Sequence, residues 1–293
     1  MRFIKMHGLG NDYIFLDLFN NPEIISRDLS ELARKMSDRH RGIGGDGIIL
    51  ICPPSSANDA DVLMRIFNSD GSEAEMCGNG IRCLARYFWD NHDFQKNRLR
   101  VETGRGVLLI RRTPTVAPGI PQFTVDMGVP VLDPARIPVD ISCLSPGSEK
   151  GEYLVHVPGG TFAGRFVSMG NPHMVIFSDE PQPTAQVSLE IVGPELENAA
   201  CFPERSNIHF ASVISRNEVR MRTWERGAGI TLACGTGACA VTVAGILAGK
   251  LDRDVQVHLP GGTLRISWPG ENESVQMTGP AEYAFAGEWH NPA

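Results

Sequence analysis

The chain of 293 residues is 42% hydrophobic, enough for one large domain or two ordinary ones, and its formal charge of −7 without any Lys/Arg block argues against nucleic acid or anionic membranes as partners. The N-terminal MRFIKMHGLGND lacks the apolar core of a signal peptide, and the longest weakly polar run, 238–249, is too short to span a bilayer. The seven scattered cysteines fit reduced thiols rather than a disulfide framework, so we expect a cytoplasmic protein.

The predicted elements begin with a helix at 27–39, where Leu29, Leu32, Ala33 and Met36 share a face behind Ser26 as the cap. The segment GIGGDG (42–47) then matches the dinucleotide pattern G-x-G-x-x-G. Because a helix precedes it and strand-like residues 48–51 follow, it predicts a tight turn or a substrate-side loop and not an NAD site. Alternating or short apolar runs predict strands at 61–68, 106–112, 122–127, 152–157, 161–168, 173–177, 207–214, 217–226, 254–259, 262–268 and 274–278.

The chain nearly repeats itself. Residues 61–83 align without a gap with residues 218–240 at an offset of 157, the separation of Cys77 and Cys234, and each copy carries Met-Arg followed by Cys-Gly-x-Gly. A looser match pairs Gly10-Asn11-Asp12 with Gly170-Asn171-Pro172 at an offset of 160. In each copy a strand, a small-residue loop and a helix (GNGIRCLARYFWDN or GTGACAVTVAGILAGK) follow one another.

A repeat of about half the chain predicts two similar domains of the α+β class, each a mostly antiparallel sheet wrapped around a central helix. Pro-rich stretches at 113–121 and 128–138 bracket the expected linker, near 120–130, so we expect domains at 1–125 and 126–274.

Cys77 and Cys234 carry the predicted chemistry. A cysteine at a helix N-terminus meets the positive end of the helix dipole, which favours the thiolate, and the glycines after it let backbone N–H groups approach a carboxylate. Two such cysteines related by a repeat indicate thiols that face each other across an interdomain cleft. That arrangement suits inversion of a stereocentre, because one thiol removes a proton while the other delivers one to the opposite face.

Other interpretations of the cysteines stay open. A buried cysteine is most often a small packing residue, although that interpretation predicts neither the repeat nor the paired glycines. The spacings of Cys77/Cys83 and Cys234/Cys239 give a zinc site poor support, so no metal is expected. A thiol redox or ligand-binding protein is the stronger rival.

Six segments resemble the diaminopimelate epimerase family of the proline-racemase-like superfamily. They are KMHGLGNDYIFLD (5–17), RHRGIGGDGIIL (39–50), RIFNSDGSEAEMCGNGIRC (65–83), VSMGNPHMVIF (167–177), ERSNIHF (204–210) and RTWERGAGITLACGTGACA (222–240), in the family's order. The resemblance implies interconversion of LL- and meso-2,6-diaminopimelate, a step toward lysine and peptidoglycan. It further implies that the last strands, within 275–293, return to the first domain, and that the protein forms a homodimer.

The resemblance also assigns roles to individual residues. Cys77 and Cys234 are the acid–base pair. The distal amino-carboxylate end of the substrate is held by Asn11, Asn68, Asn171, Asn207 and Arg226. The carboxylate at the reacting centre is seated by Gly78, Asn79, Gly235 and Thr236, and Glu225 and His173 hold the substrate amino group or assist the thiols. Asn can donate or accept and Arg can clamp a carboxylate, so the residue types suit these roles.

The sequence departs from the family at Gly47, where some members carry a substrate-contacting Gln. No cofactor is expected, since none of the five lysines lies in a glycine-rich phosphate cradle that would accompany pyridoxal phosphate. Two rivals keep the fold: a proline or hydroxyproline racemase, which usually carries His where this chain has Asn79, and an isomerase that works without the cysteines.

Overall fold

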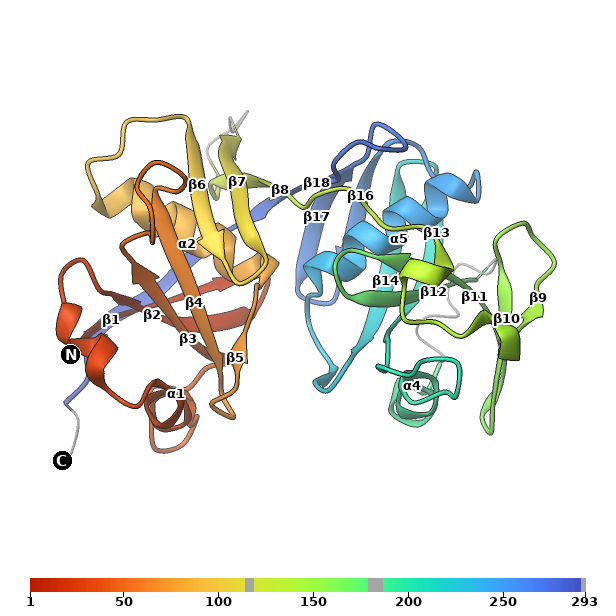
Figure 1. Cartoon of the computed structure of the whole chain (residues 1–293), viewed down its shortest axis with the longest axis horizontal. Helices are drawn as coiled ribbons and strands as arrows, with labels where there is room; N and C mark the ends of the chain where they lie inside the picture. Colours follow the sequence, from red (N-terminus) through yellow and green to blue (C-terminus); the bar gives the residue numbers. More distant parts are fainter. Residues whose placement is uncertain (114–118, 179–186, 291–293) are drawn as a thin grey trace. The chain divides into compact units, whose positions relative to one another are not determined.

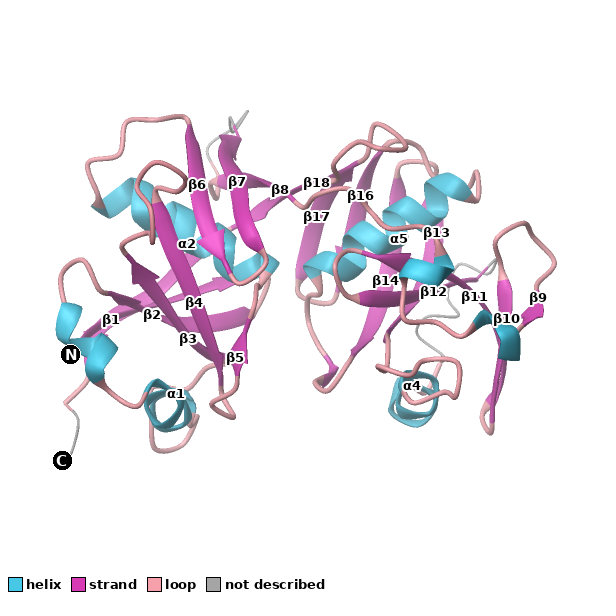
Figure 2. Cartoon of the chain, viewed as in Figure 1, coloured by secondary structure: helices cyan, strands magenta, loops and turns pink. Residues whose placement is uncertain are grey.

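The computed structural model describes residues 1–113, 119–178 and 187–290. Contacts between Cα atoms divide the chain into two compact units. Unit 1 comprises Met1–Asp126 and the C-terminal segment from Thr278, and unit 2 comprises Met127–Met277. The chain therefore passes between the units twice, and both units are mixed α and β structure dominated by strands (Figure 2).

Unit 1 is a mixed sheet with the strand order β19–β1–β2–β3–β4–β6–β7–β8. The β2/β3 and β4/β6 pairs are parallel and the others in this row are antiparallel. The strand bounds are β1 (Arg2–Gly8), β2 (Asn11–Asp17), β3 (Gly47–Cys52), β4 (Val62–Asn68), β5 (Glu73–Ala74), β6 (Arg98–Thr103), β7 (Gly106–Thr113), β8 (Gln122–Asp126) and β19 (Glu282–Glu288). Strand β18 (Gln276–Pro280) pairs with β8.

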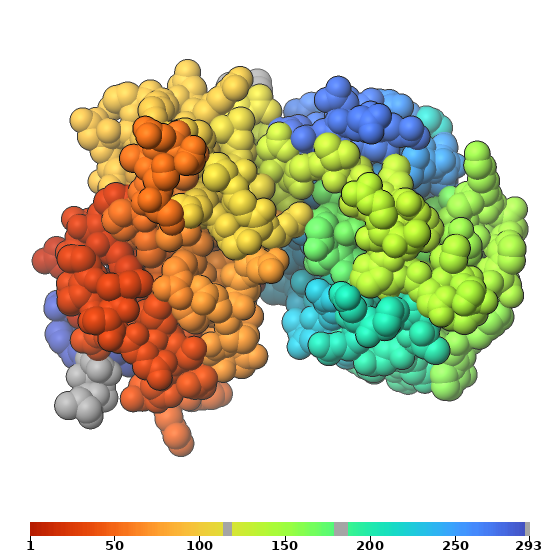
Figure 3. Space-filling model, viewed as in Figure 1, coloured from red at the N-terminus to blue at the C-terminus, as the bar shows by residue number. Residues whose placement is uncertain are grey.

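The helices of unit 1 are η1 (Pro22–Ser26), α1 (Leu29–Ser37) and α2 (Gly78–Asn91). Helix α2 packs against β1, β2 and β8, and the strands curve around it (Figure 1). Helix α1 packs against β3 and β4. In the space-filling view the C-terminal residues, in blue, lie against the N-terminal residues, in red, as the antiparallel β1/β19 pair requires (Figure 3).

Unit 2 repeats this plan with the strand order β9–β10–β11–β12–β13–β14–β16–β17. Its strands are β9 (Ser145–Pro146), β10 (Tyr153–Val157), β11 (Gly160–Ser168), β12 (Pro172–Ser178), β13 (Asn207–Ser215), β14 (Glu218–Glu225), β15 (Gly229–Ile230), β16 (Asp254–Leu259) and β17 (Gly262–Ser267). Its helices are η2 (Pro134–Arg136), η3 (Ile141–Cys143), α4 (Leu189–Glu197) and α5 (Gly235–Leu247), and α5 packs against β11, β12, β13, β16 and β17.

The two units share one pairing pattern, element for element. In unit 1, β1/β2 is antiparallel, β2/β3 parallel, β3/β4 antiparallel and β4/β6 parallel. In unit 2, β11/β12, β12/β13, β13/β14 and β14/β16 follow the same sequence of directions. The predicted α+β fold of two similar halves, each wrapped around a central helix, is therefore confirmed.

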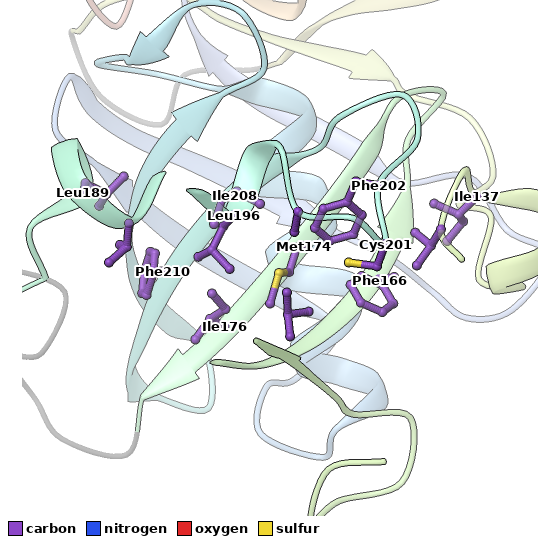
Figure 4. Packing of buried hydrophobic residues seen from close by; sticks show 14 residues of the cluster. Ile137, Phe166, Met174, Ile176, Leu189, Leu196, Cys201, Phe202, Ile208 and Phe210 are labelled. Atoms are coloured by element: carbon purple, nitrogen blue, oxygen red, sulfur yellow. The ribbon is translucent and has the colours of Figure 1, made fainter. Parts of the chain in front are cut away.

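Burial on both faces explains the apolar strands in the middle of each sheet. All six residues of β3 (GIILIC) are buried, with Ile48 and Leu50 in a core shared with α1. Ile49 lies on the opposite face, toward Gly80 of α2. In unit 2, Ile208 and Phe210 of β13 pack with Leu189 and Leu196 of α4 (Figure 4). Strands covered on both faces require nearly continuous apolar sequence.

Local chemistry accounts for most helix ends. Helix α2 spans the predicted residues 78–91, and α5 ends at Leu247, three residues before the predicted limit. The predicted cap of the first helix was wrong, because Asp28 and not Ser26 accepts the Glu31 backbone N–H at the start of α1. Helix α4 was not predicted. Within the described ranges, each helix is too short or too polar to cross a membrane.

Candidate active site

Cys77 is the residue that begins the central helix of unit 1. Its extended backbone makes it the N-cap of α2, and its Sγ accepts the Gly80 backbone N–H at 3.4 Å. The Cys77 thiol also donates to Asn11 Oδ1 at 3.3 Å and is partly exposed. The local sequence produces this geometry because glycine at position 80 leaves room for β3: an added Cβ there would lie 2.5 Å from Ile49 Cδ1.

Asn11 is the centre of a hydrogen-bonded group around Cys77. Asn11 Oδ1 accepts from Asn79 Nδ2 at 3.3 Å as well as from the thiol, and Asn11 Nδ2 donates to Asp46 Oδ2 at 2.7 Å. The Tyr13 side chain is buried beside this group, and burial, followed by the Cys77 charge, raises the pKa of Tyr13 well above its ordinary value. Asn11, Cys77 and Asn79, three of the predicted site residues, therefore form one contact network.

A fully buried arginine stiffens the start of α2. Arg82 donates to Gly78 O at 3.0 Å, to Asn79 Oδ1 at 2.8 Å and to Pro280 O at 3.1 Å. These bonds compensate the burial of the guanidinium and tie the Cys-Gly-x-Gly turn to the C-terminal segment of the same unit. The buried Arg82 guanidinium therefore fixes the turn that carries Cys77.

Cys234 occupies the corresponding position at the start of α5 in unit 2. Its thiol is buried, and burial, with the neighbouring Glu225 carboxylate as the next cause, raises the pKa of Cys234 well above its ordinary value. The Thr236 side chain and the Gly237 backbone N–H lower it less. The Glu225 carboxylate in turn accepts a short hydrogen bond from the Thr231 hydroxyl. Cys234, Glu225 and Thr236 form a second contact network.

The remaining predicted binding residues have local partners within their own units. Asn207 Nδ2 donates to Pro172 O at 2.8 Å, and Asn207 Oδ1 accepts the Arg226 backbone N–H at 3.0 Å. The Arg226 guanidinium donates to Glu204 O at 3.0 Å from an exposed position. In unit 1, Asn68 Nδ2 donates to Ser72 Oγ at 3.0 Å. Gly78 and Gly235 are the first residues of α2 and α5.

His173 belongs to a buried chain of polar side chains that the sequence did not reveal. His173 Nε2 lies 2.8 Å from Asn171 Oδ1, and His173 Nδ1 lies 2.8 Å from His209 Nε2. His209 Nδ1 lies 2.9 Å from Thr223 Oγ1. Both rings are wholly buried, and burial lowers the pKa of His209 to about 3, so His209 is neutral.

Several residues of these networks were missed from the sequence, among them Tyr13, Asp46, His209 and Thr223. The signal that could have found Tyr13 is the looser repeat, because the offset of 160 that pairs Asn11 with Asn171 also pairs Tyr13 with His173. Asp46, His209 and Thr223 are brought in by strand register and by the loop before β3, which residue spacing does not encode.

The structure gives a reason for glycine at position 47. A Cβ added to Gly47 would lie 2.2 Å from the Phe67 carbonyl oxygen, because β3 and β4 approach closely there. Backbone atoms cannot move aside cheaply, so this position admits no side chain. Among the residues that the structure describes, no group of three or more His, Cys, Asp or Glu side chains could hold a metal ion.

Comparison with known sequences identifies the relatives of the chain. The sequence model of the family described as "Diaminopimelate epimerase" matches residues 3–132 and 165–284. A diaminopimelate epimerase from Carboxydothermus hydrogenoformans is 47% identical over 289 residues, which cover 99% of each chain. One from Desulfovibrio desulfuricans is 48% identical over 292 residues, covering 99% of this chain and 98% of the relative.

Solved structures share the fold at low sequence identity. The hydroxyproline epimerase from Agrobacterium vitis, solved with trans-4-hydroxy-L-proline, superposes with a TM-score of 0.63 at 13% identity. The match covers 98% of this chain and 90% of that one. At this identity the likeness extends to the fold alone.

Proposed function

The chain belongs to the diaminopimelate epimerase family, and from this premise we propose that Cys77 and Cys234 are the two bases with which it inverts the α-carbon of diaminopimelate. The enzyme is an isomerase that interconverts the LL and meso forms, a reaction of lysine biosynthesis. The observation that carries the two-thiol proposal is the repeat: each unit presents one cysteine as the N-cap of its central helix, followed by Gly-x-Gly.

The reaction needs one thiolate and one thiol on opposite faces of the substrate carbon. Burial and the Glu225 carboxylate both raise the pKa of Cys234, so Cys234 keeps its proton at neutral pH and serves as the acid of the resting enzyme. Cys77 is less buried, and its Sγ accepts the Gly80 N–H at the positive end of α2. We therefore assign Cys77 as the base of the resting enzyme, and its hydrogen bond to Asn11 Oδ1 orients the sulfur.

We propose that both cysteines act on one substrate carbon. Loss of the α-proton places negative charge on the adjacent carboxylate as it becomes enolate-like. Backbone N–H groups at the starts of α2 and α5, with Asn79 and Thr236 beside them, would stabilise that charge. Exclusion of water from the reacting carbon would strengthen these interactions.

The second amino-carboxylate end would be held by amide and guanidinium groups that flank the cysteines. We assign it to Asn11, Asn68, Asn171, Asn207 and Arg226, with Glu225 assisting at the substrate amino group or the thiols. The two ring nitrogens of His173 are bonded to Asn171 and His209, so His173 acts through Asn171. One hydrogen bond supports this assignment: Asn207 Oδ1 accepts the Arg226 backbone N–H, which holds the two residues together where β13 begins and β14 ends. Proline has no such second end, which separates this function from that of a proline racemase.

The cytoplasm is the proposed site of action, since all seven cysteines are free thiols. A homodimer is also proposed. The exposed side chains of Phe285 and Tyr283 on β19 would give it an apolar contact.

The direct test is to incubate the reduced protein with LL-diaminopimelate, without pyridoxal phosphate, and to follow the meso form by chiral chromatography. We expect conversion of diaminopimelate and none of L-proline. Replacing Cys77 or Cys234 by Ser should each lower kcat by about 10³-fold or more, while replacing the exposed Cys143 should leave it unchanged. Racemisation of proline, or a Cys234→Ser variant with near wild-type turnover, would refute the proposal.

A further inference from the structure

The repeat supplies an internal comparison for the buried polar chain of unit 2. Strand register places Ile49 opposite Ile66 in unit 1 and His209 opposite Thr223 in unit 2. The central helices make the same comparison, because Gly80 of α2 contacts Ile49 and Gly237 of α5 contacts His209. One unit therefore builds this part of the fold with two isoleucines, so packing alone does not require a histidine and a threonine.

Tyr13 and His173 are counterparts in the same comparison. Tyr13 pairs with Gly47 across the parallel β2/β3 ladder, and His173 pairs with Asn207 across β12/β13. Each follows an asparagine by two residues, Asn11 before Tyr13 and Asn171 before His173, and His173 Nε2 lies 2.8 Å from Asn171 Oδ1. Unlike a phenol, an imidazole has two nitrogens whose roles depend on the tautomer, and His173 has a second partner, His209, on its other nitrogen.

The hydrogen-bond partners give the chain one polarity. Asn171 Oδ1 can only accept, so His173 Nε2–H must donate to it. With both rings neutral, His209 Nε2–H then donates to His173 Nδ1, and the Thr223 hydroxyl donates to His209 Nδ1. Each neutral ring then uses one donor and one acceptor, which satisfies all four nitrogens. With its oxygen turned toward His173, Asn171 presents its amide N–H groups as the donors that a carboxylate ligand requires.

We propose that His209 and Thr223 are positioning residues that, through His173, hold Asn171 as a hydrogen-bond donor to a carboxylate of the substrate. This inference rests on the proposed function, in which Asn171 binds the end of the substrate remote from the reacting carbon. The opposite tautomer of His173 would accept from Asn171, turn the amide over and direct its oxygen at the carboxylate. A His209 ring whose Nε2–H donates to His173 Nδ1, 2.8 Å away, would exclude that tautomer.

The first test is the ring tautomers in the wild-type protein, read from two-dimensional ¹H–¹⁵N spectra of ¹⁵N-histidine-labelled enzyme. The proposal predicts the Nε2–H tautomer for both His173 and His209. A protonated ring, or an Nδ1–H tautomer at either position, would overturn it. This measurement does not depend on activity, so it stands even if the wild-type protein fails to epimerise diaminopimelate, a result that would refute the proposed function instead.

The second test converts the polar chain to the pattern of unit 1 with the double variant His209→Ile/Thr223→Ile. Because Asn171 contacts a non-reacting end of the substrate, the KM for LL-diaminopimelate should rise about tenfold while kcat stays within about twofold. His209→Gln is the matched control, since its side-chain N–H can still donate to His173 Nδ1, and it should restore KM to within about threefold of wild type. Equal KM values in the wild type and a folded double variant, or a Gln variant as impaired as the double variant, would contradict the proposal.

Discussion

The two glycines that follow the cysteines by three residues should respond differently to the same substitution. An added Cβ at Gly80 would lie 2.5 Å from Ile49 Cδ1, the free end of a flexible side chain. An added Cβ at Gly237 would lie 2.3 Å from His209 Cε1 and 2.9 Å from both ring nitrogens. That ring cannot rotate away, because both nitrogens are hydrogen-bonded to neighbours at 2.8 and 2.9 Å.

The expected losses follow from these contacts. Overpacking a core typically costs about 1–3 kcal/mol, and Ala gains up to about 1 kcal/mol over Gly in a helix, so Gly80→Ala should lower the free energy of unfolding by about 1 kcal/mol. Gly237→Ala has the same overpacking cost and the same gain in helix propensity. It also displaces two buried hydrogen bonds, each worth about 1 kcal/mol or more. We expect its loss to exceed that of Gly80→Ala by about 2–3 kcal/mol.

Urea unfolding followed by tryptophan fluorescence measures the difference. Trp224 and Trp268 lie in unit 2, and Trp89 and Trp289 lie in unit 1, so hydrogen exchange of α2 and α5 should accompany it to assign each loss to its unit. Equal losses in the two variants would refute the claim that His209 is held rigidly.

Three other changes have defined outcomes. Burial lowers the pKa of His209 to about 3, so below about pH 6.5 the unfolded state binds a proton that the folded state does not. The stability of the wild type should therefore fall as the pH drops from about 6.5 toward 3. His209→Gln should flatten this slope in urea titrations at several pH values. Burial raises the pKa of Asp61 but hydrogen bonds, chiefly from Arg100, outweigh it and lower the pKa to about 2, so stability present above about pH 4 is lost toward pH 2; Asp61→Asn should cost about 1 kcal/mol at pH 7 and nothing at pH 2. Gly47→Ala forces a Cβ against Phe67 O and should cost about 3 kcal/mol or more in thermal unfolding; an unchanged melting temperature would contradict the close approach of these strands.

Much of the architecture could be predicted because the repeated segment is continuous in sequence and contains many matching residues. The 23-residue stretch around each cysteine fixes a strand, a loop and a helix start, and α2 spans the predicted residues. Helix α4 escaped prediction because Pro194 lies within it, and a proline argues against a helix interior. Burial of Leu189, Val192 and Leu196 against the core of unit 2 outweighs that cost.

The polar networks could not be predicted from spacing because they depend on register between strands far apart in the chain. In the sequence, His209 is simply a residue of a predicted buried strand, two positions after Asn207. Its role as a hydrogen-bonding group appears only from its pairing with Thr223 and its contact with His173. The same holds for Asp46, which reaches Asn11 across 35 residues. Resemblance and repeat identified the residues that bear the chemistry, and the fold was needed to find the side chains that hold them.

The central claim is that two thiols act on opposite faces of one carbon, and early-time isotope analysis in D₂O tests it most directly. The thiolate carries no proton and the thiol carries one, which is deuterium in D₂O, so the carbon loses protium to one sulfur and receives deuterium from the other. Starting from LL-diaminopimelate, we predict that the first meso product formed carries deuterium at the inverted carbon while the remaining LL substrate keeps its protium. Deuterium entering the LL substrate as fast as the meso product forms would mean that one base serves both faces, and it would contradict the account.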